Sequence, residues 1–500
     1  MVHKGLMTAA SPPAARPARP LALRAMALTL LALAAAAIFV QHLWLAQALP
    51  LWFDEAWTAE VAATPTLRTF HAEVMNDIQA PAYYAFMRLW AAAAGTSDLA
   101  LRLPGIGFLA CAAALPLSLK LKGLDGAARL AWSVLLLGWW GVGVFLLGRG
   151  YSLLLAISTL QAICFARLLA GPSRANALRW CAVAALAILT QYLALIAVAA
   201  QGLVYLIVHR RTALSTWPAL AAFVPVGAWM AIHLPRLADF AGMQSWHPLV
   251  GPTVAVSLAA FAIDPSTPLV LPLAALILIA ALARPAPVHT GGALSHLWLT
   301  ALAALLGLAL FLGAGAIRPI LTPRYLIPVV PGLLLGLVLC ARRSAHSRAA
   351  YGALMALYLA AAMGPSALQS ALRLGAPYGY ERASDTLMRR GVTQTVFVWD
   401  HQAARFERPA SIERAGAVFF RRARYPMVVT PLRPDESDDV SALALAAATG
   451  TRPGIIWIYN RDSPTAARTH PPRIAALDPR WTCERSGDET VGSLACWRRP

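Results

Sequence analysis

The sequence predicts an α-helical polytopic membrane protein, with about eleven transmembrane helices followed by a small C-terminal α/β domain. Of its 500 residues, 59% are hydrophobic and only 13% are charged, whereas about 25% of the residues of a soluble globular domain are charged. The apolar residues also form long blocks, such as 21–49 and 101–119. About 20 apolar residues cross a bilayer as a helix, because lipid offers the backbone no other partner.

The expected spans follow one another from the first apolar block to about residue 370. They are 24–45, 101–119, 129–147, 151–169, 177–190, 193–208, 215–233, 265–283, 297–315, 325–341 and 349–367. The first begins like a signal peptide, but its apolar stretch continues to Leu49, which indicates an uncleaved span after a tail of residues 1–23. The range 177–208 is also compatible with one bent segment. The segment 81–95 is short for a crossing, so we expect it on the outer face as a juxtamembrane or re-entrant helix.

The net charge of +19 comes from basic residues in short loops between the apolar blocks. These loops are 120–129, 167–179, 209–212, 284–296 and 342–348. With a cytoplasmic N-terminus all of them fall on the cytoplasmic side, as the positive-inside rule requires. This pattern accounts for the charge without nucleic acid, and it places the first loop, 46–100, and the C-terminal domain, 371–500, outside the cytoplasm.

The C-terminal residues have the pattern of a small α/β domain. The segments Thr395–Trp399, Met427–Thr430 and Gly454–Tyr459 read as buried strands, and Glu381–Arg390 reads as a helix. Cys483 and Cys496 flank a polar stretch near the C-terminus. Outside the cytoplasm they are a candidate disulfide, and two free thiols are the alternative.

The acidic residues concentrate in the first outer loop. Only nine precede residue 372, and five of these fall within 51–80. Asp54 and Glu55 lie among aromatic residues at the expected membrane surface, where lost solvation raises a carboxyl pKa and suits a general base. Asp54 could instead cap the following helix. Asp77 is a second candidate, and as a lone residue it would simply mark a helix entry.

Several arginines are expected on the same face as these acids. They include Arg102, Arg149, Arg236, Arg318 and Arg324. Some arginines at a membrane surface only extend to lipid headgroups. A guanidinium group is nonetheless the natural partner of a phosphate, because its rigid fork of donors matches the phosphate oxygens. Carboxylates facing arginines suit a reaction in which an acceptor is deprotonated while cations hold a departing phosphate.

The order of these residues resembles the GT-C glycosyltransferases. The matching elements are Phe53-Asp54-Glu55-Ala56, Asp77 with Pro81-Ala82-Tyr83-Tyr84, Leu101-Arg102-Leu103-Pro104, Gly148-Arg149-Gly150-Tyr151 and Pro323-Arg324-Tyr325. Within that superfamily, the chain is most similar to the glycosyltransferase family 39-like branch, the bacterial relatives of protein O-mannosyltransferases and aminoarabinose transferases. The resemblance covers about residues 20–370 and implies a bacterial inner membrane with the C-terminal domain in the periplasm.

The resemblance also implies a reaction and a set of site residues. A sugar would pass with inversion from a polyprenyl-phosphate donor to a glycan, lipid or protein acceptor. Asp54 would be the catalytic base, Glu55 would position a substrate and Asp77 would be the second acid. Arg149 and Arg324, with Arg318, would bind the donor phosphate, and Arg102, Tyr151 and Tyr325 would support them. Some relatives bind a divalent metal, but no cluster with ligand spacing is visible here, so a metal remains open.

Three other functions are compatible with a multi-pass chain. A transporter or flippase would place ionisable residues within its spans, whereas here the acids gather in a loop. A polymerase or ligase of lipid-linked glycans would typically use large outer loops later in the chain. A catalytically inactive membrane scaffold is the third alternative. Neither the sugar nor the acceptor can be identified from the sequence.

Overall fold

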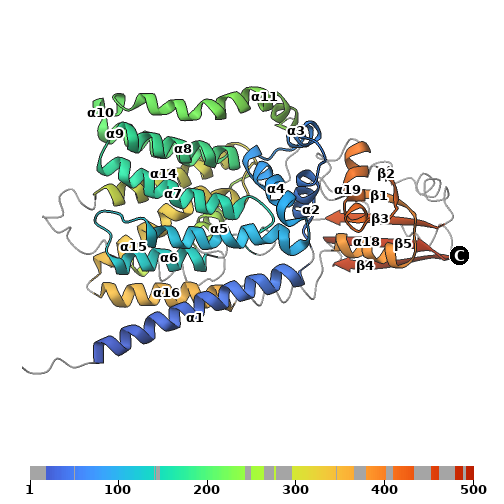
Figure 1. Ribbon diagram of the computed structural model, residues 1–500, viewed down its shortest axis with the longest axis horizontal. Helices are drawn as coiled ribbons and strands as arrows, with labels where there is room; N and C mark the ends of the chain where they lie inside the picture. The colour runs from blue at the N-terminus through green and yellow to red at the C-terminus, as the bar shows by residue number, and fades with distance from the viewer. Residues whose placement is uncertain are drawn as a thin grey trace, which may run out of the picture.

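The structure, a computed structural model, consists of a helical bundle and a C-terminal sheet domain (Figure 1). It describes residues 19–499 except 50, 140, 142, 144–146, 242–248, 264–274, 278–294, 345, 365–378, 401–408, 433–451, 461–478 and 488–490. The bundle contains α1 (Arg19–Ala48), α5 (Asp98–Ser118), α6 (Gly126–Gly138), α7 (Tyr151–Ala170), α8 (Arg174–Thr190), α9 (Ala194–His209), α10 (Arg211–Leu214), η3 (Trp217–Phe223), α11 (Val224–Ala241), α12 (Pro252–Ile263), α14 (Ser295–Ile317), η4 (Pro323–Val329), α15 (Val330–Arg343) and α16 (Ser347–Met363).

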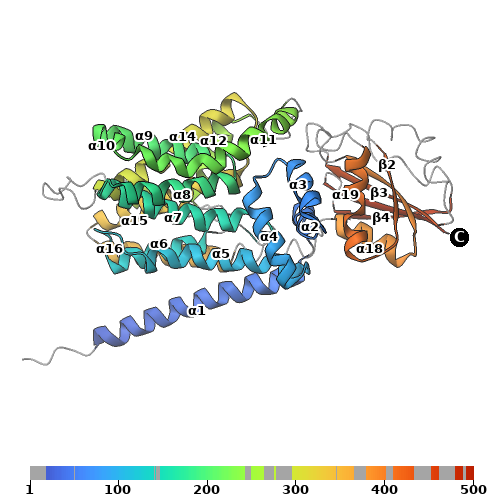
Figure 2. The same cartoon turned by 45° about the horizontal axis from the view of Figure 1, so that its top comes forward.

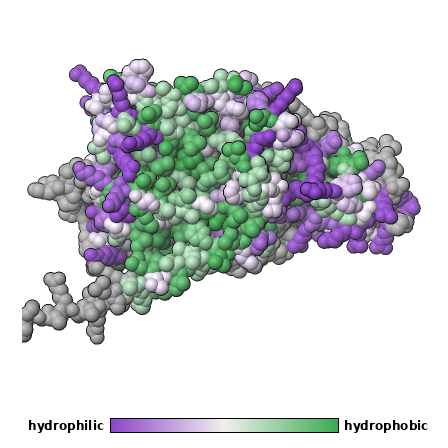
Figure 3. Space-filling model, viewed as in Figure 1, coloured by the Kyte–Doolittle hydropathy of each residue, from purple (hydrophilic) through white to green (hydrophobic). Residues whose placement is uncertain are grey.

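The bundle has the composition and dimensions of a membrane domain. Six helical segments among the described residues are long and apolar enough to cross a bilayer, and α6, α9 and α12 are shorter apolar helices. Figure 3 shows a band of apolar residues over the bundle, with hydrophilic residues at its two ends. These findings confirm the predicted helical polytopic fold class.

Most of the expected spans correspond to helices of the bundle. The range 177–208 forms two helices, α8 and α9, rather than one bent segment. The span expected at 265–283 falls almost entirely outside the described residues. The structure adds α12 just before it, which the sequence analysis did not predict. A 12-residue apolar helix is too short to be recognised as a crossing by its length.

The described residues of the basic loops lie together at one end of the bundle. His296 contacts the carbonyl of Lys122 at 3.1 Å, and Arg167 donates to the carbonyl of Lys120 at 3.2 Å. Arg342 donates to the carbonyl of Gly123 in the same loop. The opposite end of the bundle carries the acidic first loop and the C-terminal domain (Figures 1 and 2). The separation of charge expected from the sequence is therefore present in three dimensions.

Three short helices of the first loop lie between the bundle and the C-terminal domain (Figure 2). They are α2 (Phe53–Ala62), α3 (Leu67–Met75) and α4 (Pro81–Ala94). Each has a local start signal. The Glu55 carboxylate accepts the N–H of Trp52 at 3.1 Å before α2, Thr66 accepts the N–H of Thr69 before α3, and Pro81 occupies the first position of α4. The segment expected as an outer helix at 81–95 is α4.

The C-terminal domain is a five-stranded mixed sheet with strand order β2-β1-β3-β5-β4. Its strands are β1 (Gln394–Asp400), β2 (Val428–Leu432), β3 (Pro453–Asn460), β4 (Trp481–Gly487) and β5 (Val491–Arg498), and its helices are α18 (Gly379–Arg389) and α19 (Pro409–Arg422). The three expected strands and the expected helix are confirmed. Side chains alternate between the faces of β1, so Phe397 and Trp399 pack with α18 and α19 while Val396 and Val398 pack on the other face.

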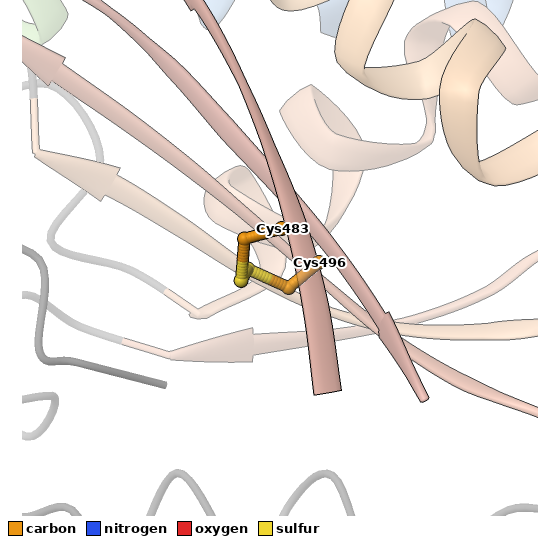
Figure 4. Close-up of a disulfide and its surroundings, with 2 residues drawn as sticks. All are labelled: Cys483 and Cys496. Atoms are coloured by element: carbon orange, nitrogen blue, oxygen red, sulfur yellow. A yellow bond between two sulfur atoms is a disulfide. The ribbon is translucent and has the colours of Figure 1, made fainter. Parts of the chain in front are cut away.

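A disulfide joins the two antiparallel strands at the edge of this sheet. Cys483 of β4 lies directly opposite Cys496 of β5, and their sulfur atoms are bonded (Figure 4). Of the two alternatives that the sequence left open, the structure therefore contains the disulfide. It links the strand β5, which pairs with β3, to the outermost strand of the sheet.

Candidate active site

A buried ion pair fixes the start of α2. Arg102 of α5 donates to Glu55 through Nε at 3.1 Å and through a terminal nitrogen at 2.6 Å, and both side chains are 0% exposed. Arg102 also donates to the carbonyls of Ala46 and Leu49, at 3.0 and 2.7 Å, at the end of α1. One guanidinium group therefore joins α1, α2 and α5, and it fills the hydrogen-bonding needs of a buried charge.

The loop before α7 packs closely on this ion pair. The N–H of Gly148 donates to Glu55 Oε1 at 2.9 Å. A Cβ atom on Gly148 would lie 2.9 Å from the same oxygen, and one on Gly150 would lie 3.1 Å from the Tyr83 side chain. A side chain at Gly148 would therefore force Glu55 to shift, and one at Gly150 would press on Tyr83. The two glycines thus allow Arg149, which lies between them, to enter the site from the bundle.

Arg149 is the centre of a buried polar network. It is 4% exposed, and its guanidinium donates at 3.0 Å to both the backbone carbonyl of Asp54 and the hydroxyl of Thr58. A weaker contact of 3.4 Å reaches the hydroxyl of Tyr84, which in turn donates to the carboxylate of Asp77. The network connects the loop before α7 with α2 and α4, so both acidic segments of the first loop contact the same group of side chains around Arg149.

Asp54 lies in the first turn of α2 and is partly exposed. Its charge interacts with both Arg149 and Arg324. The side chains of Asp54 and Glu55 thus have different surroundings, although they are adjacent in sequence. Glu55 is held by four internal hydrogen bonds, whereas Asp54 combines partial exposure with two neighbouring cations.

A second group of polar atoms lies where α7 and η4 meet. The guanidinium carbon of Arg324 is 5.6 Å from the centroid of the Tyr151 ring and 5.9 Å from that of Tyr325. The Tyr151 hydroxyl, Arg324 Nε and the Thr322 hydroxyl are buried and have no hydrogen-bond partner among the described residues. Buried donors are normally satisfied, so this end of the bundle has unused capacity to bind a polar or anionic group.

Burial keeps the two tyrosines of the loop in their neutral form. Burial, and next the charge of Asp77, raise the pKa of Tyr84 well above its ordinary value. Burial likewise raises the pKa of Tyr83, whose hydroxyl has no partner among the described residues. Tyr84 therefore acts as a hydrogen-bond donor to Asp77 across the neutral pH range, and it fixes the direction of the Asp77 carboxylate.

The structure brings together most of the residues singled out from the sequence. Contacts or electrostatic interactions connect Asp54, Asp77, Arg149, Arg324, Tyr151 and Tyr325. Arg318 is different. It is exposed at the end of α14 and makes no side-chain hydrogen bond or ion pair with another described residue. Glu55 and Arg102 belong to the adjoining buried ion pair.

The sequence analysis did not single out Thr58 and Tyr84 as site residues. Thr58 lies one turn after Asp54, a spacing that places both on the same side of α2, and this was the available signal. Tyr84 belongs to the Pro81-Ala82-Tyr83-Tyr84 element, but its contact with Asp77 depends on the turn between α3 and α4. Among the described residues, no group of three or more His, Cys, Asp or Glu side chains is placed to hold a metal ion.

Comparison with solved structures identifies proteins of similar fold. ArnT from Cupriavidus metallidurans in the apo state matches with a TM-score of 0.55 and 14% sequence identity, over 95% of this chain and 98% of that chain. The structure of ArnT bound to undecaprenyl phosphate matches with a TM-score of 0.53 and 13% identity, over 94% and 98%. The arabinofuranosyltransferase AftD from Mycobacteria has a TM-score of 0.47 and 16% identity, over 94% of this chain and 40% of that chain.

No family model and no curated protein matches the sequence. The likeness to ArnT extends over nearly the whole of both chains, including the C-terminal domain. It confirms the GT-C fold that the sequence resemblance implies.

Proposed function

We propose that this chain, a multi-pass membrane protein with the GT-C fold, is a glycosyltransferase that moves a sugar from a polyprenyl-phosphate donor to an extracytoplasmic acceptor. Two findings that do not depend on the site residues support the proposal. ArnT, which has a similar fold, is known in a complex with undecaprenyl phosphate. The described residues of the basic loops and the candidate site lie at opposite ends of the bundle. By the positive-inside rule, this arrangement supports a site outside the cytoplasm.

The observation that carries the proposal is the group of buried polar atoms of Arg324, Tyr151 and Thr322. Three buried polar groups there have no partner among the described residues, and Arg149 adds a second positive charge beside Asp54. A phosphate offers several acceptor oxygens and negative charge, and therefore matches both the unused donors and the cations. The donor phosphate would bind at this position.

Asp54 is the group proposed to activate the acceptor. It is the partly exposed carboxylate of the site, and its neighbours are the two proposed phosphate-binding arginines. The Asp54 carboxylate would take the proton of the acceptor hydroxyl while the hydroxyl oxygen forms a bond to the anomeric carbon. The bond from that carbon to the phosphate oxygen would break, and Arg149 and Arg324 would stabilise the charge of the leaving phosphate. A single displacement inverts the anomeric configuration.

The remaining predicted residues are proposed to hold these groups in place. Asp77 accepts the Tyr84 hydroxyl that contacts Arg149, so it would fix the position of that guanidinium. Glu55 would act in the same way through its bonds to Arg102 and Gly148, and not by contact with a substrate. We assign no part in phosphate binding to Arg318, because its side chain contacts none of the other proposed site residues.

The test is transfer from purified polyprenyl-phosphate sugars in reconstituted vesicles. Asp54→Asn should reduce transfer at least 100-fold, the size typical of a general base, while leaving thermal stability near that of the wild-type protein. Full activity of this variant would refute the assignment of Asp54. Mass spectrometry of envelope glycans in cells without the protein would identify the sugar and its acceptor.

A matched pair of arginine variants tests the phosphate site. Arg324→Ala should weaken donor binding, because it removes the guanidinium beside Tyr151. Arg342→Ala removes the same side chain at the other end of the bundle, where it donates to the carbonyl of Gly123. Equal effects of the two variants on donor affinity would contradict the proposed location of the phosphate.

A further inference from the structure

The first loop and the C-terminal domain share an interface of opposite charges. Three arginines of α19 form ion pairs with three acidic residues of the loop region. The pairs are Arg421 with Glu60, Arg414 with Glu73, and Arg422 with Asp98. The acids belong to α2, α3 and α5, whereas all three arginines come from one helix. One face of α19 thus binds three separate elements of the membrane domain.

The geometry of these contacts is specific. Arg421 binds Glu60 through two parallel bonds of 2.7 Å each, the bidentate form that adds directional preference to an ion pair. Arg422 also donates to the carbonyl of Thr96 at 3.0 Å. The Arg414 guanidinium carbon lies 5.7 Å from the centroid of the Trp57 ring, on α2. Two of the three arginines therefore contact α2 directly.

Apolar contacts join the same two parts next to Asp54. The ring of Phe53 lies 4.8 Å from that of Trp399 and 5.7 Å from that of Tyr380, measured between centroids. Both partners belong to the C-terminal domain. Alanines of α2 and the sheet side chain Phe397 belong to the same buried cluster. The residue just before Asp54 is thus packed into the core of the C-terminal domain.

Helix α18 adds a hydrogen bond at the beginning of α2. The Glu381 carboxylate accepts the N–H of Leu51 at 2.9 Å. Burial, and then the charges of Asp98 and Asp385, raise the pKa of Glu381 to about 7, while the Leu51 N–H and Arg422 act in the opposite direction. This contact therefore changes its charge close to neutral pH.

We propose that the C-terminal domain positions Asp54 through an electrostatic clasp, in which Arg414 and Arg421 hold α2 and Arg422 ties α19 to α5. The bundle fixes one side of α2 through Arg102 and Arg149, and the clasp fixes the other. Ion pairs at a surface contribute little singly, but here three act on one interface with the aromatic contacts of Phe53. Arg414 and Arg421 are positioning residues, since they act through α2. The link to catalysis rests on the proposed function, whereas the clasp itself does not.

A charge swap between Arg421 and Glu60 tests the clasp in the full-length protein. Arg421→Glu and Glu60→Arg each place like charges against one another, and each should speed amide hydrogen exchange of residues 53–62 about three- to tenfold. The double variant restores opposite charges and should return exchange toward the wild-type rate. Arg382→Glu makes the same change of charge at an exposed position of α18 and should leave this exchange unaltered.

Kinetics test whether the clasp positions Asp54. Each single variant should lower kcat several-fold with the KM for the donor within about twofold of wild type, and the double variant should recover kcat. Unchanged exchange in both single variants, or no recovery in the double variant, would overturn the clasp. Faster exchange with unchanged kcat would overturn the positioning role. A wild-type protein without transfer activity would refute the proposed function alone, because the exchange measurement needs no substrate.

Discussion

Replacing Arg102 by alanine should be among the most damaging single changes in the membrane domain. The guanidinium is fully buried and bonds to both oxygens of Glu55 and to two backbone carbonyls. Removing one partner of a buried ion pair costs about 3–5 kcal/mol, because the other charge stays buried without compensation. The two carbonyls, of Ala46 and Leu49, would lose a charged donor as well, and each unsatisfied group costs about 1–3 kcal/mol. These costs are not additive, so a total of about 4 kcal/mol is expected.

The assay is thermal or denaturant unfolding of the purified protein in detergent, with Arg102→Ala, Arg102→Lys and the double variant Arg102→Met with Glu55→Leu. Lysine keeps the charge but not the fork of donors, so it should recover only part of the loss. The double variant removes both charges and should be more stable than Arg102→Ala. If Arg102→Ala is as stable as the wild-type protein, Arg102 does not compensate a buried charge. A double variant that is less stable than Arg102→Ala would refute the same view.

Three further predictions concern the surroundings of the site. Gly148→Ala should displace Glu55 and cost about 1–3 kcal/mol of stability. Gly107→Ala, whose added Cβ meets nothing within 4 Å, should not destabilise in the same unfolding assay and should stabilise α5 by up to about 1 kcal/mol. Between pH 4.5, the ordinary pKa of a glutamate, and about pH 7, Glu381 is more protonated in the folded protein than in the unfolded chain. The free energy of unfolding should therefore fall by up to about 3 kcal/mol as the pH rises through that window. Glu381→Gln should flatten the profile of melting temperature against pH. Cys483→Ser removes the disulfide and should destabilise the C-terminal domain by about 2–4 kcal/mol, seen as faster proteolysis of that domain.

The sequence was sufficient for the helical membrane fold and for the main features of the C-terminal domain. Both depend on patterns that are local in the chain, such as runs of apolar residues and alternating strands. The strands β4 and β5 were not predicted. The exposed positions of β4, including Glu484 and Arg485, lack that alternation. The helix α12 was missed because 12 residues are fewer than a crossing requires.

The candidate residues could be found from the sequence, but their partners could not. Asp54 and Glu55 are adjacent and look equivalent in the sequence. Their difference arises because Arg102, 47 residues after Glu55, is buried against it. Arg318 and Arg324 likewise share one short segment, yet the end of α14 leaves the first exposed while η4 turns the second toward Tyr151. Such distinctions depend on tertiary packing, which a single sequence does not display.

The strand order of the C-terminal sheet has a consequence for how this protein can be handled. Strand β5 follows every other strand in the chain, yet it lies inside the sheet between β3 and β4. A chain cut before Val491 would expose a whole edge of β3, detach β4 and leave Cys483 without its bonded sulfur. Truncations from the C-terminal side should therefore retain β5 as far as Arg498.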